Sequence, residues 1–358
     1  MLRIFSKVEE GKRLSYEDGV TLYRSNDVVG LGRIANLARE RKNGEVAYYI
    51  VNRHINYTNI CVNRCRFCAF SRSEGEPGAY LLSVEECLEK AESFRGGEVS
   101  EFHIVGGLHP TLGLDYYAEL LSALRARYPG VHLQAFTAVE VAHISKVARI
   151  SVRACLERLQ KAGLGSLPGG GAEVFAPRVR EQLCPQKLPG SDWLEVMRTA
   201  HSLGIRSNCT LLYGHLERPE EVVDHLLELR QLQDDTGGFL AFIPLAFHPA
   251  HTALAGAVSG PTAWDDLRLI AVSRLLLDNL PHVKVFWIMV GLKVAQIALS
   301  FGADDVDGTV VEERITHAAG AETPEALTIQ ELHRLISGAG REPVARDTLY
   351  QPVEVTGR

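Results

Sequence analysis

Three cysteines stand close together in the segment Cys61-Val-Asn-Arg-Cys65-Arg-Phe-Cys68. Thiolates are soft ligands that suit iron–sulfur clusters and zinc. The segment follows a short apolar run, and its spacing allows all three sulfurs to reach one cluster. A cubane 4Fe-4S cluster has four irons, so three sulfurs leave one iron open, unlike an electron-transfer site with four cysteines. The segment therefore predicts an iron–sulfur cluster with an open coordination position.

The remaining cysteines are scattered singly and are expected to be small buried or half-buried residues: Cys87, Cys155, Cys184 and Cys209. Structural zinc sites prefer four ligands in paired spacings, and no second C-x2-C or H-x3-H pattern is evident. A zinc loop or three unrelated cysteines are the alternatives, and the spacing favours the cluster over both. An odd total of seven cysteines in 358 residues does not fit a secreted disulfide scaffold.

The composition is that of an ordinary globular protein with a small acidic surplus. Because the net charge is −6, a phosphate backbone is a poor partner, and nucleic acid is not expected to bind. No apolar run approaches the roughly 20 residues of a membrane span. The first residues lack the pattern of a secretory signal. We therefore expect a cytoplasmic protein without a membrane partner.

The elements that must position the cysteines recur in a regular order after residue 50. Short apolar runs alternate with amphipathic segments, separated by turn residues or glycines. About eight such units predict an α/β fold with a parallel sheet, closed as a (β/α)8 TIM-type barrel. A six-strand partial barrel would give most of the same signals. Residues 1–50 are predicted as an N-terminal helical extension packing on the barrel, 51–322 as the barrel, and 323–358 as a C-terminal helix with an irregular tail.

The cysteine motif, with Phe67 directly before its third cysteine, resembles the signature of the radical S-adenosylmethionine superfamily. The wider stretch 56–70 resembles the group that contains aminofutalosine synthases, dehypoxanthine futalosine cyclases and deazaflavin synthase subunits. Segments along nearly the whole chain resemble the aminofutalosine synthase family in particular. They are residues 103–110, 135–140, 166–173, 206–208, 212–215, 243–248 and 301–305.

This resemblance implies that Cys61, Cys65 and Cys68 hold a 4Fe-4S cluster whose open iron binds S-adenosyl-L-methionine. An electron from a donor such as a flavodoxin or ferredoxin would cleave it to methionine and a 5′-deoxyadenosyl radical. In this family the radical adds to the enol ether of 3-[(1-carboxyvinyl)oxy]benzoate, in menaquinone biosynthesis, and bicarbonate leaves. The product, 6-amino-6-deoxyfutalosine, keeps the adenosyl group, so the resemblance implies a transferase with a small-molecule substrate.

Candidate contacts for S-adenosylmethionine fall near expected strand ends, which face the active site of such a barrel. Glycines let backbone approach a ligand closely, and by resemblance Gly106 and Gly107 receive the methionine amino group, although an ordinary turn explains them equally well. Carboxylates can accept from ribose or ammonium groups, and arginine pairs well with carboxylates. Glu140, which follows a strand expected over 131–139, and Glu173 are candidates for the carboxylate role, and Arg178 is the candidate for the arginine role. For each of the three, an ordinary surface charge is the alternative. Phe67, directly before the third cysteine, is the last expected contact for S-adenosylmethionine.

The implied substrate carries two carboxylates, so cationic or donor groups are expected to converge on it. Candidates at expected strand ends are Arg206, Tyr213, His215 and His248. Asp305 is a candidate proton acceptor or ribose contact, and Asn63 and Arg64 could contact substrate or shield the cluster. We expect no certain acid–base catalyst, because the cofactor carries the difficult chemistry and the protein supplies binding and orientation.

Two other functions stay open at the level of sequence. A dehypoxanthine futalosine cyclase or a deazaflavin synthase would use the radical to abstract hydrogen and would release free 5′-deoxyadenosine. A protein of a different class would hold the cluster for electron transfer or sensing and would leave S-adenosylmethionine intact. A whole barrel is excessive for holding one cluster, which weighs against this last function.

Overall fold

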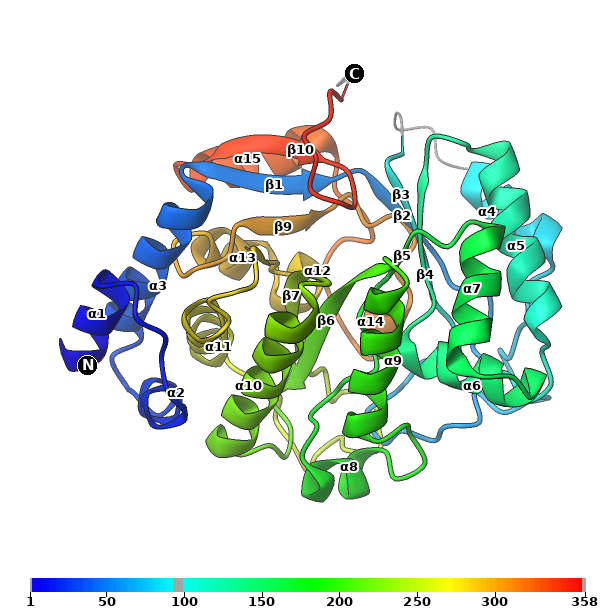
Figure 1. The fold of residues 1–358 in the computed structure, drawn as a ribbon, viewed down its shortest axis with the longest axis horizontal. Helices are drawn as coiled ribbons and strands as arrows, with labels where there is room; N and C mark the ends of the chain where they lie inside the picture. Colours follow the sequence, from blue (N-terminus) through cyan, green and yellow to red (C-terminus); the bar gives the residue numbers. More distant parts are fainter. Residues whose placement is uncertain (1, 93–98, 356–358) are drawn as a thin grey trace.

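The computed structural model describes residues 2–92 and 99–355 and shows a ring of parallel strands with helices outside it (Figure 1). Seven of these strands form one continuous sheet in which all neighbours are parallel. They are β2 (Asn52–Ile55), β3 (Glu101–Ile104), β4 (His132–Ala135), β5 (Ser166–Leu167), β6 (Arg206–Tyr213), β7 (Phe239–Ala246) and β8 (His282–Val283).

An eighth strand, β9 (Asp305–Gly308), closes the ring between β8 and β2. One bridge joins Lys284, just after β8, to the start of β9, and another joins Arg53 of β2 to Val311. The N–H of His54 donates to the carbonyl of Val311 over 3.0 Å. The expected α/β barrel of eight strands is therefore confirmed, and the six-strand alternative is not what the chain forms.

Helices connect successive strands and cover the outside of the ring, as parallel strands require (Figure 1). They are α4 (Val84–Glu92), α5 (Leu114–Arg127), α6 (Ala138–Ala148), α7 (Val152–Ala162), α8 (Pro177–Leu183), α9 (Gly190–Ser202), α10 (Pro219–Thr236), α11 (Ala263–Leu276), α12 (Trp287–Val290) and α13 (Leu292–Ala298). A further short helix, α14 (Ile315–Ala318), follows β9 and lies at the inside of the barrel end rather than on its outside. Their apolar sides pack on the strands; in α5, for example, Leu120, Leu121 and Leu124 are fully buried. None of the described helices is long and apolar enough to cross a membrane.

Both ends of the described chain join a second parallel sheet, which sequence reasoning missed. Its order is β10 (Glu342–Arg346), β1 (Val46–Ile50) and then β9 of the ring. Residues up to 50, expected to be helical, form α1 (Leu2–Glu9), α2 (Tyr16–Tyr23) and α3 (Val28–Asn43) and end in β1. The tail, expected to be irregular after one helix, forms α15 (Ile329–Gly338) and then β10. Residues 1 and 356–358 of the two expected terminal segments lie outside the described residues.

Buried ion pairs tie the second sheet to the ring. Arg274 of α11 pairs with Asp304, and both side chains are fully buried. His282 Nδ1 lies 2.6 Å from the same carboxylate. Next to it, Asp305 of β9 pairs with Arg346 of β10 over 2.6 Å. Asp304 and Asp305, at the start of β9, thus anchor α11 and the C-terminal strand rather than facing solvent.

Candidate active site

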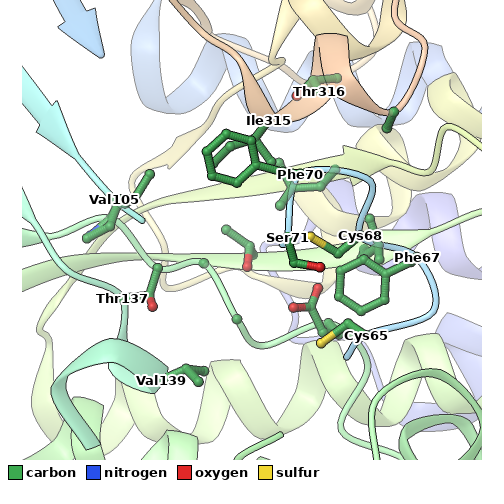
Figure 2. Close-up of a pocket in the computed structure, with 18 of the residues that line it drawn as sticks. Cys65, Phe67, Cys68, Phe70, Ser71, Val105, Thr137, Val139, Ile315 and Thr316 are labelled. Carbon is green, nitrogen blue, oxygen red and sulfur yellow. The ribbon is translucent and has the colours of Figure 1, made fainter. Parts of the chain in front are cut away.

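A cavity of about 310 Å³ opens at the carboxyl ends of the barrel strands. Its walls come from the cysteine loop, the ends of β3, β6 and β7, the start of α6, and α14. Figure 2 shows the cysteine loop on one side of the cavity, with Val105, Thr137 and Val139 across it. This is the end of a (β/α)8 barrel at which active sites form.

The cysteine loop, residues 61–68, is held by backbone hydrogen bonds to two neighbouring elements. The N–H of Val62 donates to the carbonyl of Leu108, after β3, over 3.0 Å, and that of Arg66 donates to the carbonyl of Leu183, in α8, over 2.8 Å. All three thiols of the loop are half-buried and line the cavity. The loop therefore presents its sulfurs to the inside of the barrel.

These thiols fit an iron–sulfur cluster better than the zinc alternative. No three His, Cys, Asp or Glu side chains in the described part of the chain surround a point where one metal ion could sit, as zinc requires. A cubane has its ligands spread over separate corners. Burial raises the pKa of the Cys61 thiol. A hydrogen bond with the buried Cys184 thiol raises that of Cys65. Bound iron therefore has to favour the thiolates.

Gly106 and Gly107 follow β3 beneath this loop, and their missing side chains make room for it. A methyl group at Gly107 would lie 2.3 Å from the carbonyl oxygen of Ile60, and one at Gly106 would lie 2.7 Å from the Tyr57 ring. Both glycine N–H groups are already donated, one to a carboxylate and one to a backbone carbonyl. No described residue donates a hydrogen bond to either carbonyl, and carbonyls can accept from an ammonium group of a ligand.

Glu140 lies in the first turn of α6, because β4 ends at Ala135 and the strand expected over 131–139 is too long. Its carboxylate is buried at the cavity wall. It accepts from the Tyr57 hydroxyl over 2.7 Å, the Gly106 N–H over 3.0 Å and the Thr137 N–H over 2.7 Å. Burial raises the pKa of Glu140, and these hydrogen bonds oppose the rise. Glu140 thus positions the glycine turn.

We expect Glu140→Gln to raise the KM for S-adenosylmethionine by roughly tenfold, the effect of losing one charged hydrogen bond. Glutamine can still accept from Tyr57 and Gly106, but its amide would point an N–H at the N–H of Thr137. Initial rates of 5′-deoxyadenosine formation at varied S-adenosylmethionine measure the effect. A change in kcat alone would mean that Glu140 does not act through the glycine turn.

Glu173 lines the cavity after the glycine run and forms a buried ion pair with Lys187. The Lys187 ammonium lies 5.3 Å from the centre of the Phe67 ring, within cation–π range. Glu173 has a φ of 50°, a left-handed conformation that a residue with a side chain adopts at a cost of about 1–2 kcal/mol. The structure therefore brings Phe67 and Glu173 together beside the cluster loop, with a lysine that the sequence did not single out.

The arginines proposed from sequence lie outside the cavity. Arg178 donates to Glu221 over 2.7 and 2.6 Å, and Arg64 is exposed, 3.6 Å from Glu76. Arg206 was expected to end a strand, which is wrong: it begins β6, so it lies exposed at the opposite end of the barrel. None of the described cavity residues is an arginine. A carboxylate bound there has to find other donors.

Tyr213 and His215 do lie at or just after the end of β6, but their side chains point away from the cavity. The Tyr213 hydroxyl donates to Asp266 over 2.7 Å, and the His215 ring contacts the Leu212 carbonyl over 2.9 Å. Asp305 is likewise occupied, in its ion pair with β10. These candidates are structural in this fold.

Asn63 and His248 are the expected substrate residues that do line the cavity. The Nε2 atom of His248 lies 2.9 Å from the Met289 carbonyl, which leaves Nδ1 for a ligand. Several other polar residues line the cavity without having been site candidates from the sequence: His54, His103, Thr137, Lys187, Asp307 and Glu313. Asp307 stands two residues after Asp305, the spacing of side chains on one face of a strand. Its φ of 67° is left-handed rather than extended, and a strand pattern in the sequence does not reveal this conformation.

An ion pair holds the segment that covers one side of the cavity. His317 Nδ1 lies 3.2 Å from the carboxylate of Glu313, which lines the cavity. This hydrogen bond raises the pKa of His317 from 6.5 to about 9. Because the folded chain binds this proton more tightly than the unfolded chain, the ion pair contributes its full stability below the unfolded pKa of 6.5. That stability is lost as the pH rises through the folded pKa of about 9.

We therefore expect His317→Gln to destabilise the protein near pH 6 by about 1 kcal/mol, a value reduced for solvent screening. Above about pH 10 the two proteins should unfold at the same temperature, because the wild-type histidine is then neutral. Thermal unfolding at both values measures this. An equal difference at both would show that packing, not charge, is lost.

Two family models match the chain. One is described as the radical SAM superfamily and covers residues 55–229. The other is described as the CofH/MqnC C-terminal region and covers residues 236–358. Together they span the barrel and the C-terminal elements.

Curated relatives are similar over nearly their full lengths. The chain is 48% identical to aminodeoxyfutalosine synthase of Thermus thermophilus, covering 100% of this chain and 97% of that protein. It is 46% identical to aminodeoxyfutalosine synthase of Streptomyces coelicolor, covering 96% and 92%. It is also 41% identical to 5-amino-6-(D-ribitylamino)uracil–L-tyrosine 4-hydroxyphenyl transferase of Methanopyrus kandleri, covering 90% and 89%.

Among solved structures, methylornithine synthase (PylB) superposes with a TM-score of 0.75 at 18% identity, covering 95% of this chain and 97% of that one. At that identity the likeness shows the fold alone. The sequence relatives, by contrast, are close enough to place the chain among enzymes. This chain belongs to the aminodeoxyfutalosine synthase family of the radical S-adenosylmethionine superfamily.

Proposed function

We propose that this enzyme adds the 5′-deoxyadenosyl radical to the enol ether of 3-[(1-carboxyvinyl)oxy]benzoate. The products would be 6-amino-6-deoxyfutalosine, methionine and bicarbonate, in menaquinone biosynthesis. The observation that carries the proposal is the identity of 48% and 46% to two aminodeoxyfutalosine synthases. The three thiols that face one cavity support it, because they leave an iron free for a substrate group.

When bound, a 4Fe-4S cluster and S-adenosylmethionine supply the radical, with the electron from a donor such as a flavodoxin or ferredoxin. The chain's own residues bind and orient. The carbonyls of Gly106 and Gly107 would accept from the methionine ammonium. Phe67, Glu173 and its lysine partner border the same region.

The rest of the cavity excludes water from a reactive carbon radical. Much of its wall is apolar, with Val139, Leu212, Ile243 and Phe286 among the lining residues. Ile315 of α14 lies across the top of the view in Figure 2. Those four apolar side chains carry no S–H bond, the weak bond from which a carbon radical most readily takes a hydrogen atom.

A second candidate is the reaction named for the Methanopyrus kandleri relative, which transfers a 4-hydroxyphenyl group from L-tyrosine to 5-amino-6-(D-ribitylamino)uracil. The identity of 41% to the Methanopyrus kandleri protein favours it. That activity, like a futalosine cyclase, is expected to release free 5′-deoxyadenosine, whereas the addition keeps the adenosyl group in the product.

The test is anaerobic turnover of the reconstituted holoenzyme with S-adenosylmethionine, a strong reductant and each substrate set in turn. An adduct by mass that carries both the adenosyl group and the benzoate ring supports the proposed function. Free 5′-deoxyadenosine and a tyrosine-derived adduct would support the second candidate and overturn the first. Intact S-adenosylmethionine with a fully loaded cluster would overturn both.

A further inference from the structure

A polar layer crosses the barrel at the floor of the cavity. His54 of β2, His103 of β3, Gln134 of β4 and Ser166 of β5 face one another at paired positions on neighbouring strands. The interior of such a barrel is usually filled by bulky aliphatic side chains. Burying polar groups costs free energy unless each finds a partner. The fold alone therefore does not explain this layer.

Hydrogen bonds orient one ring of the layer. The Gln134 amide nitrogen donates to the Ser166 hydroxyl over 3.2 Å, which turns its oxygen towards His103 Nδ1, also 3.2 Å away. Nδ1 therefore carries a hydrogen, and Nε2 is the nitrogen of His103 left for a ligand. His54 stacks on this ring, with the centroids 4.5 Å apart, and its own Nε2 is buried without a hydrogen-bond partner among the described residues.

The charged groups around the two rings allow the histidine pair to take up one proton when an anion binds. Glu101 lies 3.9 Å from His103 Nδ1, behind the ring as seen from the ligand side. Lys284 and Asp307 pair with each other over 3.6 Å. Burial lowers the pKa of both histidines, so the pair is neutral while no anion is bound. An anion bound at Nε2 would raise the pKa of the pair and favour the imidazolium form, which Glu101 would stabilise from the other side.

The cavity offers few other donors to an anionic substrate. Its described lining contains no arginine, and its lysine, Lys187, is already paired with Glu173. His54 and His103 both line the cavity, and His248 stands apart at the end of β7. An imidazolium donates a charge-assisted hydrogen bond to a carboxylate, which is about twice as strong as a neutral one.

We propose that the His54–His103 pair binds one carboxylate of an aromatic acid substrate and takes up a proton when it does so. The site stands on the geometry of the layer, and the identity of the ligand rests on the proposed function. In this arrangement the ligand enters as a carboxylate, Nε2 of the pair donates to it, and the proton comes from solvent.

Calorimetric titration of 3-[(1-carboxyvinyl)oxy]benzoate into oxidised holoenzyme with S-adenosylmethionine tests this without turnover. Binding heats are compared near pH 7.5 in phosphate and in Tris, whose ionisation enthalpies differ. We expect an uptake of about one proton per ligand bound. Binding without proton uptake would overturn the proposal, and this readout needs no variant.

Variants then locate the proton. His103→Asn and His54→Asn should each weaken binding by roughly 10- to 100-fold and reduce the proton uptake. His201→Asn is the matched control, because that half-buried imidazole is bonded to Thr236 and Ser207 and does not line the cavity. Uptake that persists in both histidine variants but vanishes in Asp307→Asn would assign the proton to that carboxyl group and overturn the proposal.

The two proposals fail in distinguishable ways. If wild-type enzyme forms the adenosyl adduct but binds substrate without taking up a proton, the function stands and the histidine site is wrong. If substrate binds with proton uptake that depends on His103 but no adduct forms, the site stands and the reaction is wrong.

Discussion

Replacing Cys65 by alanine is expected to abolish the cleavage of S-adenosylmethionine. The loop supplies three sulfurs, and with one removed a cubane would have two open corners instead of one. No fourth cysteine of the loop can take its place, although the buried Cys184 thiol lies close enough to Cys65 to raise its pKa. Iron and sulfide content after anaerobic reconstitution, visible absorption, and 5′-deoxyadenosine formation under reduction measure the loss. Cleavage at the wild-type rate in this variant would contradict the assignment of Cys65 as a ligand.

Cys155→Ala is the matched control, since Cys155 is fully buried in α7 and does not line the cavity. It should bind a full cluster and cleave S-adenosylmethionine at the wild-type rate, at a cost of about 1 kcal/mol in stability for the lost sulfur. Loss of iron from this variant as well would mean that cluster content reports folding rather than ligation.

The barrel was predictable because its repeat is local. Each apolar run and each following amphipathic segment lies within one stretch of sequence, and parallel strands require helices between them. The second sheet was not predictable in the same way. Strand β10 contains Pro343, which a strand tolerates only at an edge, and only the folded chain shows that β10 is an edge. The short apolar run over 285–289 has the composition of a strand, yet part of it forms α12.

The candidate site was likewise predictable only where its chemistry depends on residues close together in the sequence. The cysteines could be identified because their spacing along the chain carries the chemistry. The arginines could not, because a guanidinium's role depends on which carboxylate it meets in space. Arg178 meets Glu221 on α10, and Arg206 stands at the wrong end of its strand. The histidine pair shows the reverse case, since His54 and His103 lie far apart in sequence and become neighbours only through strand register.

The second large effect is expected at the buried ion pair beneath β9. Asp304→Asn should destabilise the fold by about 3–5 kcal/mol, because it leaves the fully buried Arg274 without a charged partner. The asparagine can still accept the N–H of Val283, so the loss reports charge rather than shape. Urea unfolding at neutral pH measures it. Asp278→Asn, which touches a partly exposed pair with Arg13, is the matched control and should cost less than about 1 kcal/mol.

The pH dependence separates this charge effect from a packing defect. Burial pushes the pKa of Asp304 upward, but Arg274 and the hydrogen bonds from His282 and Val283 outweigh it, so the pKa is lowered in the folded chain. A lowered pKa gives stability that is present above the unfolded value of about 4 and is lost as the pH falls through the folded value. The difference between wild type and Asp304→Asn should therefore shrink below about pH 4. Both proteins are compared without cluster, so that acid loss of iron does not contribute. A difference that stays constant with pH would contradict the ion pair as the source of the stability.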